Sequence, residues 1–163
     1  MKKLTAILCF ALSLALGSFG TSAAGRGCYT AHEYEAEQGL RIHSELMVIG
    51  LTCLKMPGGR QIYDKYARFT QKNQSLIAEY ETEMIGYYRH EGAPNPEKNL
   101  HTLRTNLAND ISKHAIQMST ASFCQAFSSR VDQALAMDQS KIRKWAQQVW
   151  PKTPASHPVC PRR

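Results

Sequence analysis

Apolar residues recur at helical spacing along most of this chain after residue 30. The clearest example has the i, i+4, i+7, i+11 spacing of one helix face, and its members are Ile42, Leu46, Ile49 and Cys53. Thr30 and Glu33 have the spacing of a capping box, and Pro-Gly-Gly at 57–59 ends the pattern. We therefore predict a first helix over about residues 31–55.

The same periodicity predicts three further helices. The second covers about 60–90, and its apolar face consists of Ile62, Tyr66, Phe69, Leu76, Tyr80, Met84 and Tyr87. Asn95 before Pro96 is a favoured helix start, so the third covers about 96–118. The fourth covers about 121–149. Hydroxyl residues at 119–122 favour a turn before it, but the absence of Gly and Pro there leaves one long bent helix as the alternative.

The first 24 residues have the parts of a secretory signal peptide. Lys2 and Lys3 precede an apolar run at 4–16, and Ala24 ends a small-residue stretch suited to cleavage. The run is shorter than the ~20 residues that span a bilayer, so we expect no transmembrane span after cleavage. We predict a periplasmic or secreted protein with a helical domain at 25–150 and a proline-rich extended tail at 151–163.

Four cysteines follow the signal segment, and an even number in an oxidising compartment indicates two disulfides. Three pairings are open to four cysteines. A helix rises ~1.5 Å per residue, which places Cys28 and Cys53 too far apart to pair across the first helix. In an antiparallel bundle the end of the first helix meets Cys124, and the tail returns Cys160 to Cys28. We predict an all-α fold, an up-down four-helix bundle stapled by the disulfides Cys53–Cys124 and Cys28–Cys160.

The chain is basic, with a formal net charge of +7. Because its cations are mostly scattered, we interpret this charge chiefly as a source of solubility and expect no specific nucleic-acid partner. The densest basic and aromatic segment comprises Lys141, Arg143, Lys144, Trp145 and Trp150. It is a candidate surface for an anionic envelope component. The alternative is a helix with core-facing tryptophans and a solvated basic face.

A polar layer in the proposed bundle is a candidate metal site. His43, Asn73, His114 and Asp138 fall near the same height when each helix is counted at ~1.5 Å per residue. Histidine and carboxylate side chains bind zinc and other divalent ions. The proposed core lacks the Glu-x-x-His pairs of metal-binding bundles, so a hydrogen-bonded polar layer is the alternative. We expect no cofactor.

Three segments resemble a group of small exported bacterial helical proteins with paired cysteines. They are SELMVIGLTC (44–53), LHTLRTNLAND (100–110) and ASFC (121–124). The resemblance implies a bacterial envelope or secreted location. It includes no catalytic motif and implies no activity, so no site residue is transferred from it.

The chain lacks the common catalytic motifs Gly-x-Ser-x-Gly and His-Glu-x-x-His, and it has no phosphate-binding glycine loop. We therefore assign no catalytic residue. Glu33, Glu35 and Glu37 are interpreted as complementing the dipole of the first helix.

We expect a non-enzymatic binding or accessory protein of the cell envelope, with an envelope protein or an anionic envelope component as partner. One alternative is a small envelope enzyme such as a cell-wall glycan hydrolase. That reaction requires two carboxylates across a cleft, one of them in an apolar setting, and the sequence does not single out such a pair. The other alternative is a carrier of a metal or small ligand.

Overall fold

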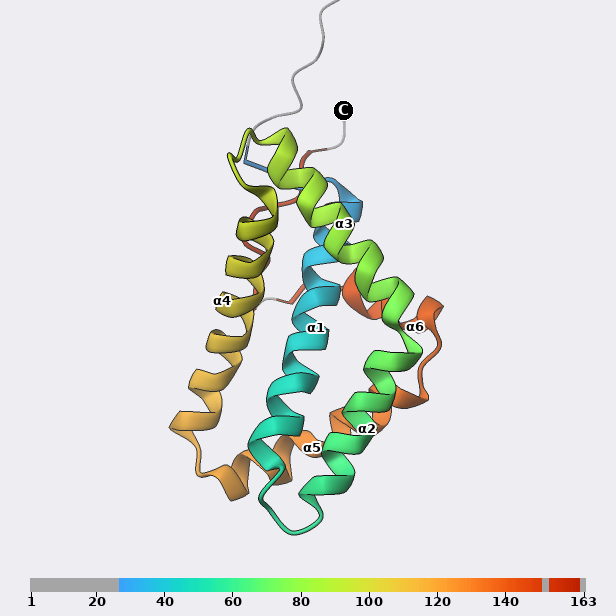
Figure 1. The fold of residues 1–163 in the computed structure, drawn as a ribbon, viewed down its shortest axis with the longest axis vertical. Coiled ribbons are helices and arrows are strands. Elements are labelled where there is room, and N and C mark those ends of the chain that lie inside the picture. Colours follow the sequence, from blue (N-terminus) through green and yellow to red (C-terminus); the bar gives the residue numbers. More distant parts are fainter. Residues whose placement is uncertain (1–26, 151–152, 162–163) are drawn as a thin grey trace, which may run out of the picture.

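The computed structural model describes residues 27–150 and 153–161. This part of the chain contains six α-helices and no β-strand, which confirms the all-α class (Figure 1). The helices are α1 (Ala31–Cys53), α2 (Gly59–Lys72), α3 (Gln74–His90), α4 (Pro96–Gln117), α5 (Thr120–Ala136) and α6 (Gln139–Ala146). The predicted signal segment, residues 1–24, lies outside the described residues.

Helix α1 is the central element, and each of the other five helices packs against it. It begins with the predicted capping box, in which the Thr30 hydroxyl accepts a hydrogen bond from the Glu33 amide and the Glu33 carboxylate accepts one from the Thr30 amide. All four residues of its predicted apolar face are buried. The helix is also buried well beyond that face, because neighbours surround it on nearly every side.

The predicted second helix is divided into α2 and α3 at Asn73. The backbone of Asn73 leaves helical geometry, with φ −111° and ψ 17°. Its buried side-chain amide donates to the Phe69 carbonyl at 2.9 Å. Asn side chains compete in this way with the regular helix ladder, which explains a break without Gly or Pro.

Capping residues also separate the last helices. Ser119 accepts a hydrogen bond from the Ser122 amide at the start of α5, so α4 and α5 are separate helices rather than one bent helix. The predicted fourth helix is itself divided, because Met137 is extended and Asp138 caps α6 by accepting from the Lys141 amide at 2.8 Å. Aspartate favours the N-cap position because its carboxylate satisfies an amide that has no partner within the helix.

The up-down four-helix topology is not confirmed. Helices α1 and α4 run in one direction, and α2 and α3 together run in the other (Figure 1). Helix α5 then crosses the lower end of the molecule, and α6 follows it after a break. The described helices therefore surround α1 instead of forming four equivalent columns. None of them is long and apolar enough to cross a membrane.

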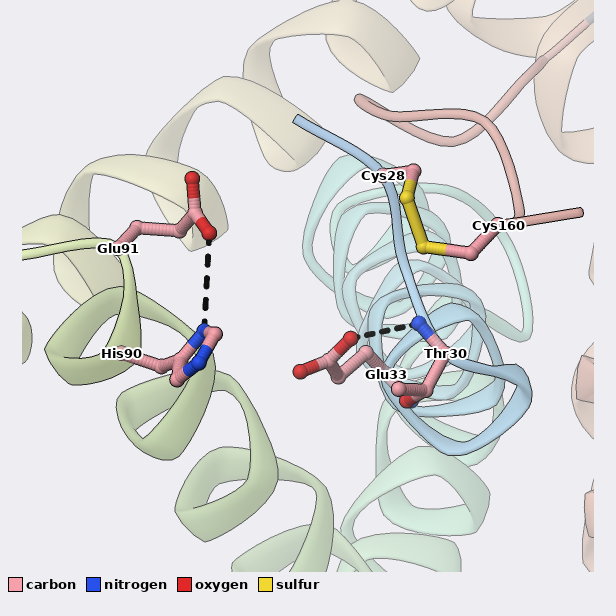
Figure 2. The surroundings of a disulfide bond; sticks show 6 residues. All are labelled: Cys28, Thr30, Glu33, His90, Glu91 and Cys160. Atoms are coloured by element: carbon pink, nitrogen blue, oxygen red, sulfur yellow. Dashed lines mark hydrogen bonds and ion pairs between the residues drawn. A yellow bond between two sulfur atoms is a disulfide. The ribbon is translucent and has the colours of Figure 1, made fainter. Parts of the chain in front are cut away.

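Both predicted disulfides are present. Cys53 at the end of α1 is joined to Cys124 in α5, with 5.7 Å between their Cα atoms. Cys28 is joined to Cys160, with 5.0 Å between Cα atoms, beside the capping box of α1 (Figure 2). A short parallel bridge reinforces the second link, because the Tyr29 amide donates to the Pro158 carbonyl and the Cys160 amide donates to the Tyr29 carbonyl. The C-terminal segment is thus held against the start of α1.

Candidate ligand-binding cavity

A cavity of about 750 Å³ lies between α1, α4, α5 and the C-terminal segment. Helix α1 supplies one stripe of side chains at i, i+3, i+4 and i+7 spacing, namely Gln38, Arg41, Ile42 and Glu45. Helix α5 supplies a second stripe at i, i+4 and i+7, namely Phe123, Phe127 and Arg130. Asp110, Ile111, Lys113, His114 and Gln117 of α4 line another wall, and Trp150, Thr153 and Pro154 complete the lining.

An ion pair joins two walls of this cavity. Arg130 of α5 donates through Nη2 to the Glu45 carboxylate of α1 at 2.9 Å. The same guanidinium lies over the rings of Trp145 and Trp150, 5.5 and 5.9 Å from their centroids. These cation–π contacts connect α6 and the residue Trp150 to α5. Burial raises the pKa of Glu45, and the positive charge of Arg130 opposes that rise.

Arg41 attaches the C-terminal segment to α1. Its Nη2 donates to the Glu37 carboxylate at 3.4 Å and to the Pro154 carbonyl at 3.1 Å. Pro154 lines the cavity, so this contact holds one wall in place. The Cys28–Cys160 disulfide fixes the same segment at its far end.

Unsatisfied hydrogen-bond donors are concentrated around the cavity. Among the described residues, five buried side-chain nitrogen or oxygen atoms have no hydrogen-bond partner. Four of them are N–H groups of residues that line this cavity, namely Gln38 Nε2, Arg41 Nε, Arg130 Nε and Trp150 Nε1. Leaving a buried donor without a partner costs ~1–3 kcal/mol, so such groups are uncommon and require an explanation.

Glu35 and Glu37 occupy a different environment from the one proposed for them. The expected contribution to the helix dipole fits Glu33, which forms the capping box, but Glu35 and Glu37 are buried. Glu35 accepts hydrogen bonds from Tyr80, Arg143 and Gln147. Glu37 accepts from Tyr29, Arg41 and the Ser156 amide. These two carboxylates are structural anchors that hold α6 and the C-terminal segment against α1.

The structure does not bring the proposed metal ligands together. His43 is buried and shares a hydrogen bond of 3.2 Å with the Thr70 hydroxyl of α2. His114 is exposed on α4, where it lines the cavity, and Asp138 caps α6. Within residues 27–150 and 153–161, no group of three or more His, Cys, Asp or Glu side chains is arranged to hold a metal ion.

The basic and aromatic segment proposed for anionic partners is divided between two roles. Arg143 forms ion pairs with Glu35 and Glu79, and Lys141 lies 3.9 Å from the Asp138 carboxylate. Lys144 is exposed, whereas Trp145 and Trp150 are half-buried. Only Trp150 of this segment lines the cavity. Arg143 therefore supplies structural ion pairs and Trp150 one wall of the cavity, while the role of the segment toward an anionic partner stays a prediction.

Apart from His114, sequence reasoning did not identify the polar residues of the cavity. Gln38, Arg41 and Glu45 were not proposed for any site, although they form one stripe of a helix expected to be largely buried. That stripe was the available signal, because long polar side chains along a buried helix face need partners from elsewhere in the fold. Arg130 gave no comparable signal, since its partners come from α1 and the C-terminal segment.

Comparison with known proteins gives no relative on which to base a function. The chain matches no protein-family model, no curated protein and no solved structure.

Proposed function

We propose that this chain is a non-enzymatic binding protein of the bacterial cell envelope and that it holds a small ligand in the cavity beside α1. The observation that carries the proposal is a cavity of about 750 Å³ whose lining combines apolar side chains with polar and charged ones. Ligand sites typically have volumes of ~300–1,000 Å³, apolar walls and a few polar groups that orient the ligand. The cavity has such a volume, and Ile42, Phe123 and Phe127 line it beside polar side chains.

The N-terminal sequence and the disulfides support an envelope location. Residues 1–24 have the pattern of a secretory signal peptide, and Cys28–Cys160 and Cys53–Cys124 are the kind of bond that persists in an oxidising compartment. We propose a periplasmic or secreted protein on this basis. The net positive charge is also compatible with an anionic envelope partner.

Native mass spectrometry of protein purified from the periplasm without refolding tests the binding function. We expect a mature chain cleaved after Ala24, lacking four thiol hydrogens and carrying the extra mass of a small molecule. Ile111→Trp fills the cavity from α4 and removes that extra mass. Ile116→Trp makes the same change on the same helix, at a side chain that is 82% exposed and outside the cavity, and retains it.

Two results would contradict the binding function. One is a wild-type chain with no bound molecule that also fails to take up a small apolar probe in solution. The other is equal occupancy in the Ile111→Trp and Ile116→Trp proteins, which would place the ligand outside the cavity.

A cell-wall glycan hydrolase is the second candidate function, and one observation favours it. Glu45 and Asp110 both line the cavity, and burial raises the pKa of Glu45, as expected for a general acid. The ion pair with Arg130 argues against this role, because the positive charge opposes the rise in the pKa of Glu45 and so favours the charged carboxylate.

A clearing assay on cell-wall glycan decides between the two functions. Turnover that is lost in Glu45→Gln and retained in Glu83→Gln, which alters an exposed carboxyl, would establish the hydrolase and overturn the non-enzymatic proposal. We expect no turnover from the wild-type protein.

A further inference from the structure

We propose that the Cys28–Cys160 disulfide is a redox latch, and that its reduction by a dithiol frees the C-terminal segment, residues 153–161, to open away from α1. The second disulfide, Cys53–Cys124, stays oxidised and keeps α1 and α5 together. Because the C-terminal segment lines the cavity, its opening also speeds the exchange of a bound molecule. That consequence rests on the proposed function, whereas the latch itself does not.

The two disulfides differ in how easily a reductant can reach them. Cys53 is 0% exposed and Cys124 is 7% exposed, and both lie within helices. Cys28 and Cys160 are each half-buried, and their bond joins two non-helical segments beside the start of α1 (Figure 2). Reduction requires a thiolate to approach one sulfur of the bond, so its rate depends on access. A reductant in solution therefore reaches Cys28–Cys160 first.

The other contacts that the structure describes between the C-terminal segment and α1 are non-covalent. The Ser156 amide donates to the Glu37 carboxylate at 2.9 Å. The Tyr29 amide, just before α1, donates to the Pro158 carbonyl at 2.8 Å, and the rings of Tyr29 and His157 pack edge to face with centroids 5.0 Å apart. Residues near a chain end open readily unless they are tied down. Breaking the disulfide therefore leaves the segment docked but able to open.

The C-terminal segment lines two spaces. Thr153 and Pro154 belong to the wall of the cavity beside α1. Ser156 belongs to the wall of a second pocket of about 500 Å³, whose other residues lie mainly on α4. Opening of the segment therefore removes part of a wall from each space. Trp150 also lines the cavity, but the Arg130 guanidinium lies over its ring and holds that part of the wall in place.

The latch opens by thiol–disulfide exchange. One thiolate of the dithiol attacks the sulfur of one cysteine, so that the S–S bond breaks, a mixed disulfide forms and the other cysteine leaves as a thiolate. The second thiolate of the dithiol then attacks its own partner sulfur in the mixed disulfide. This step forms a disulfide in the reductant and expels the second cysteine thiolate. Two electrons pass from the dithiol to the protein, whose thiolates take up the protons that the dithiol lost.

Partial reduction of the native protein tests the order in which the disulfides open. The oxidised protein is treated with dithiothreitol in the absence of denaturant, free thiols are blocked with iodoacetamide at intervals, and peptide mass spectrometry locates them. We expect Cys28 and Cys160 to be labelled about tenfold faster than Cys53 and Cys124, because access limits the attack. Reduction of Cys53–Cys124 first, or of both bonds at the same rate, would overturn the latch.

Hydrogen exchange of backbone amides tests the opening of the segment. In protein with only Cys28–Cys160 reduced, we expect the Tyr29 and Ser156 amides to exchange about tenfold faster than in oxidised protein, because both donate across the opening contact. The amide of Leu46, in the buried middle of α1, is the internal reference and should exchange equally in both forms. Equal exchange of Tyr29 and Ser156 in the two forms would overturn the latch, since the non-covalent contacts would then suffice.

A pair of serine variants removes each disulfide without a reductant. The double variant Cys28→Ser, Cys160→Ser should reproduce the fast exchange of the reduced protein. The matched control is Cys53→Ser, Cys124→Ser, which should not raise the exchange of the segment relative to the middle of α1. If either variant does not fold, the selectively reduced wild-type protein decides the latch.

The exchange of a cavity probe separates the latch from the proposed function. The probe is N-phenyl-1-naphthylamine, a neutral apolar molecule whose fluorescence rises on binding, and stopped-flow mixing measures its dissociation. We expect severalfold faster dissociation from the protein with the reduced latch. Equal dissociation rates would overturn the control of the cavity and leave the binding function in place. If neither form binds the probe, the result counts against the binding function, and the order of reduction and the amide exchange still decide the latch.

Discussion

Helix α1 bears two buried polar clusters that differ in how completely their hydrogen bonds are satisfied. In the acid cluster, Glu35 and Glu37 together accept hydrogen bonds from six donors, which lie on other elements as well as on α1. Around the cavity, one turn further along the helix, four donors have no partner among the described residues. A fully satisfied buried cluster rigidifies a fold, whereas an incompletely satisfied one is unstable until something else supplies the missing partners. The comparison therefore assigns a stabilising role to the acids, whereas the unpartnered donors beside the cavity reduce stability.

The largest loss of stability is expected from a substitution in the acid cluster. Glu37→Gln removes a buried charge from Tyr29, Arg41 and the Ser156 amide, and we expect a loss of about 3 kcal/mol in the free energy of unfolding, measured in urea. Glu83→Gln, an exposed position, should stay within about 0.5 kcal/mol of wild type. A loss below 1 kcal/mol in Glu37→Gln would remove the structural role of the cluster.

The dependence of the free energy of unfolding on pH tests the buried side chain of His43 on the same helix. Burial, aided by the positive charge of Arg104, lowers the pKa of His43 from 6.5 to about 4. His43 is therefore neutral in the folded protein, and its contribution to stability is present above pH 6.5 and lost as the pH falls to 4. We expect the wild-type protein to lose about 3 kcal/mol more than His43→Gln over this range. If the free energy of unfolding falls with pH equally in the wild-type and His43→Gln proteins, His43 does not titrate in this way.

A glycine next to the two clusters tests the packing of the acid cluster. A Cβ atom on Gly39 would lie 2.1 Å from the ring of Tyr80, the residue that donates to Glu35. Gly39→Ala should therefore cost about 2 kcal/mol of unfolding free energy. Gly86→Ala adds the same atom where nothing lies within 4 Å and should stabilise α3 by about 0.5–1 kcal/mol. If both substitutions changed the free energy of unfolding in the same direction, the result would contradict the close approach of Tyr80 to Gly39.

The smallest change in stability is expected at the cavity, where the substitution should stabilise the protein. Gln38→Met replaces an unsatisfied buried amide by an apolar side chain, so the empty protein should gain about 1 kcal/mol in thermal or urea unfolding. Glu37 and Gln38 are neighbours in the sequence and are both buried, yet substitution of one should destabilise the protein and substitution of the other should stabilise it. A loss of stability in Gln38→Met would mean that Gln38 already has a partner in the folded protein.

Local rules and simple geometry account for what could be predicted from the sequence. The capping box, the Asn95 start of α4 and both disulfides followed from spacing, helix rise and antiparallel connection. The breaks at Asn73 and Asp138 were missed, because Asn and Asp also occur inside helices and their capping geometry depends on the surrounding fold.

The two polar clusters could not be predicted for a different reason. Glu35 and Glu37 stand near a helix start, where exposed acids are common. Their burial depends on Arg143, Gln147 and Ser156, which are more than 100 residues away in the sequence. The cavity depends likewise on Trp150 and Arg130 reaching α1, and the lack of a hydrogen-bond partner is a property of the folded chain alone.

Indole N–H resonances provide the most direct test of the contrast between the clusters. The chain has two tryptophans, so a ¹⁵N-tryptophan spectrum contains one signal for Trp150, which lines the cavity, and one for Trp145, which does not. Titration with a small apolar probe that has no aromatic ring should shift the Trp150 signal, because the side chain of Trp150 lines the cavity. The Trp145 signal should move little. An unchanged Trp150 signal at the highest probe concentration would show that the probe does not enter the cavity and would contradict the account of the cavity.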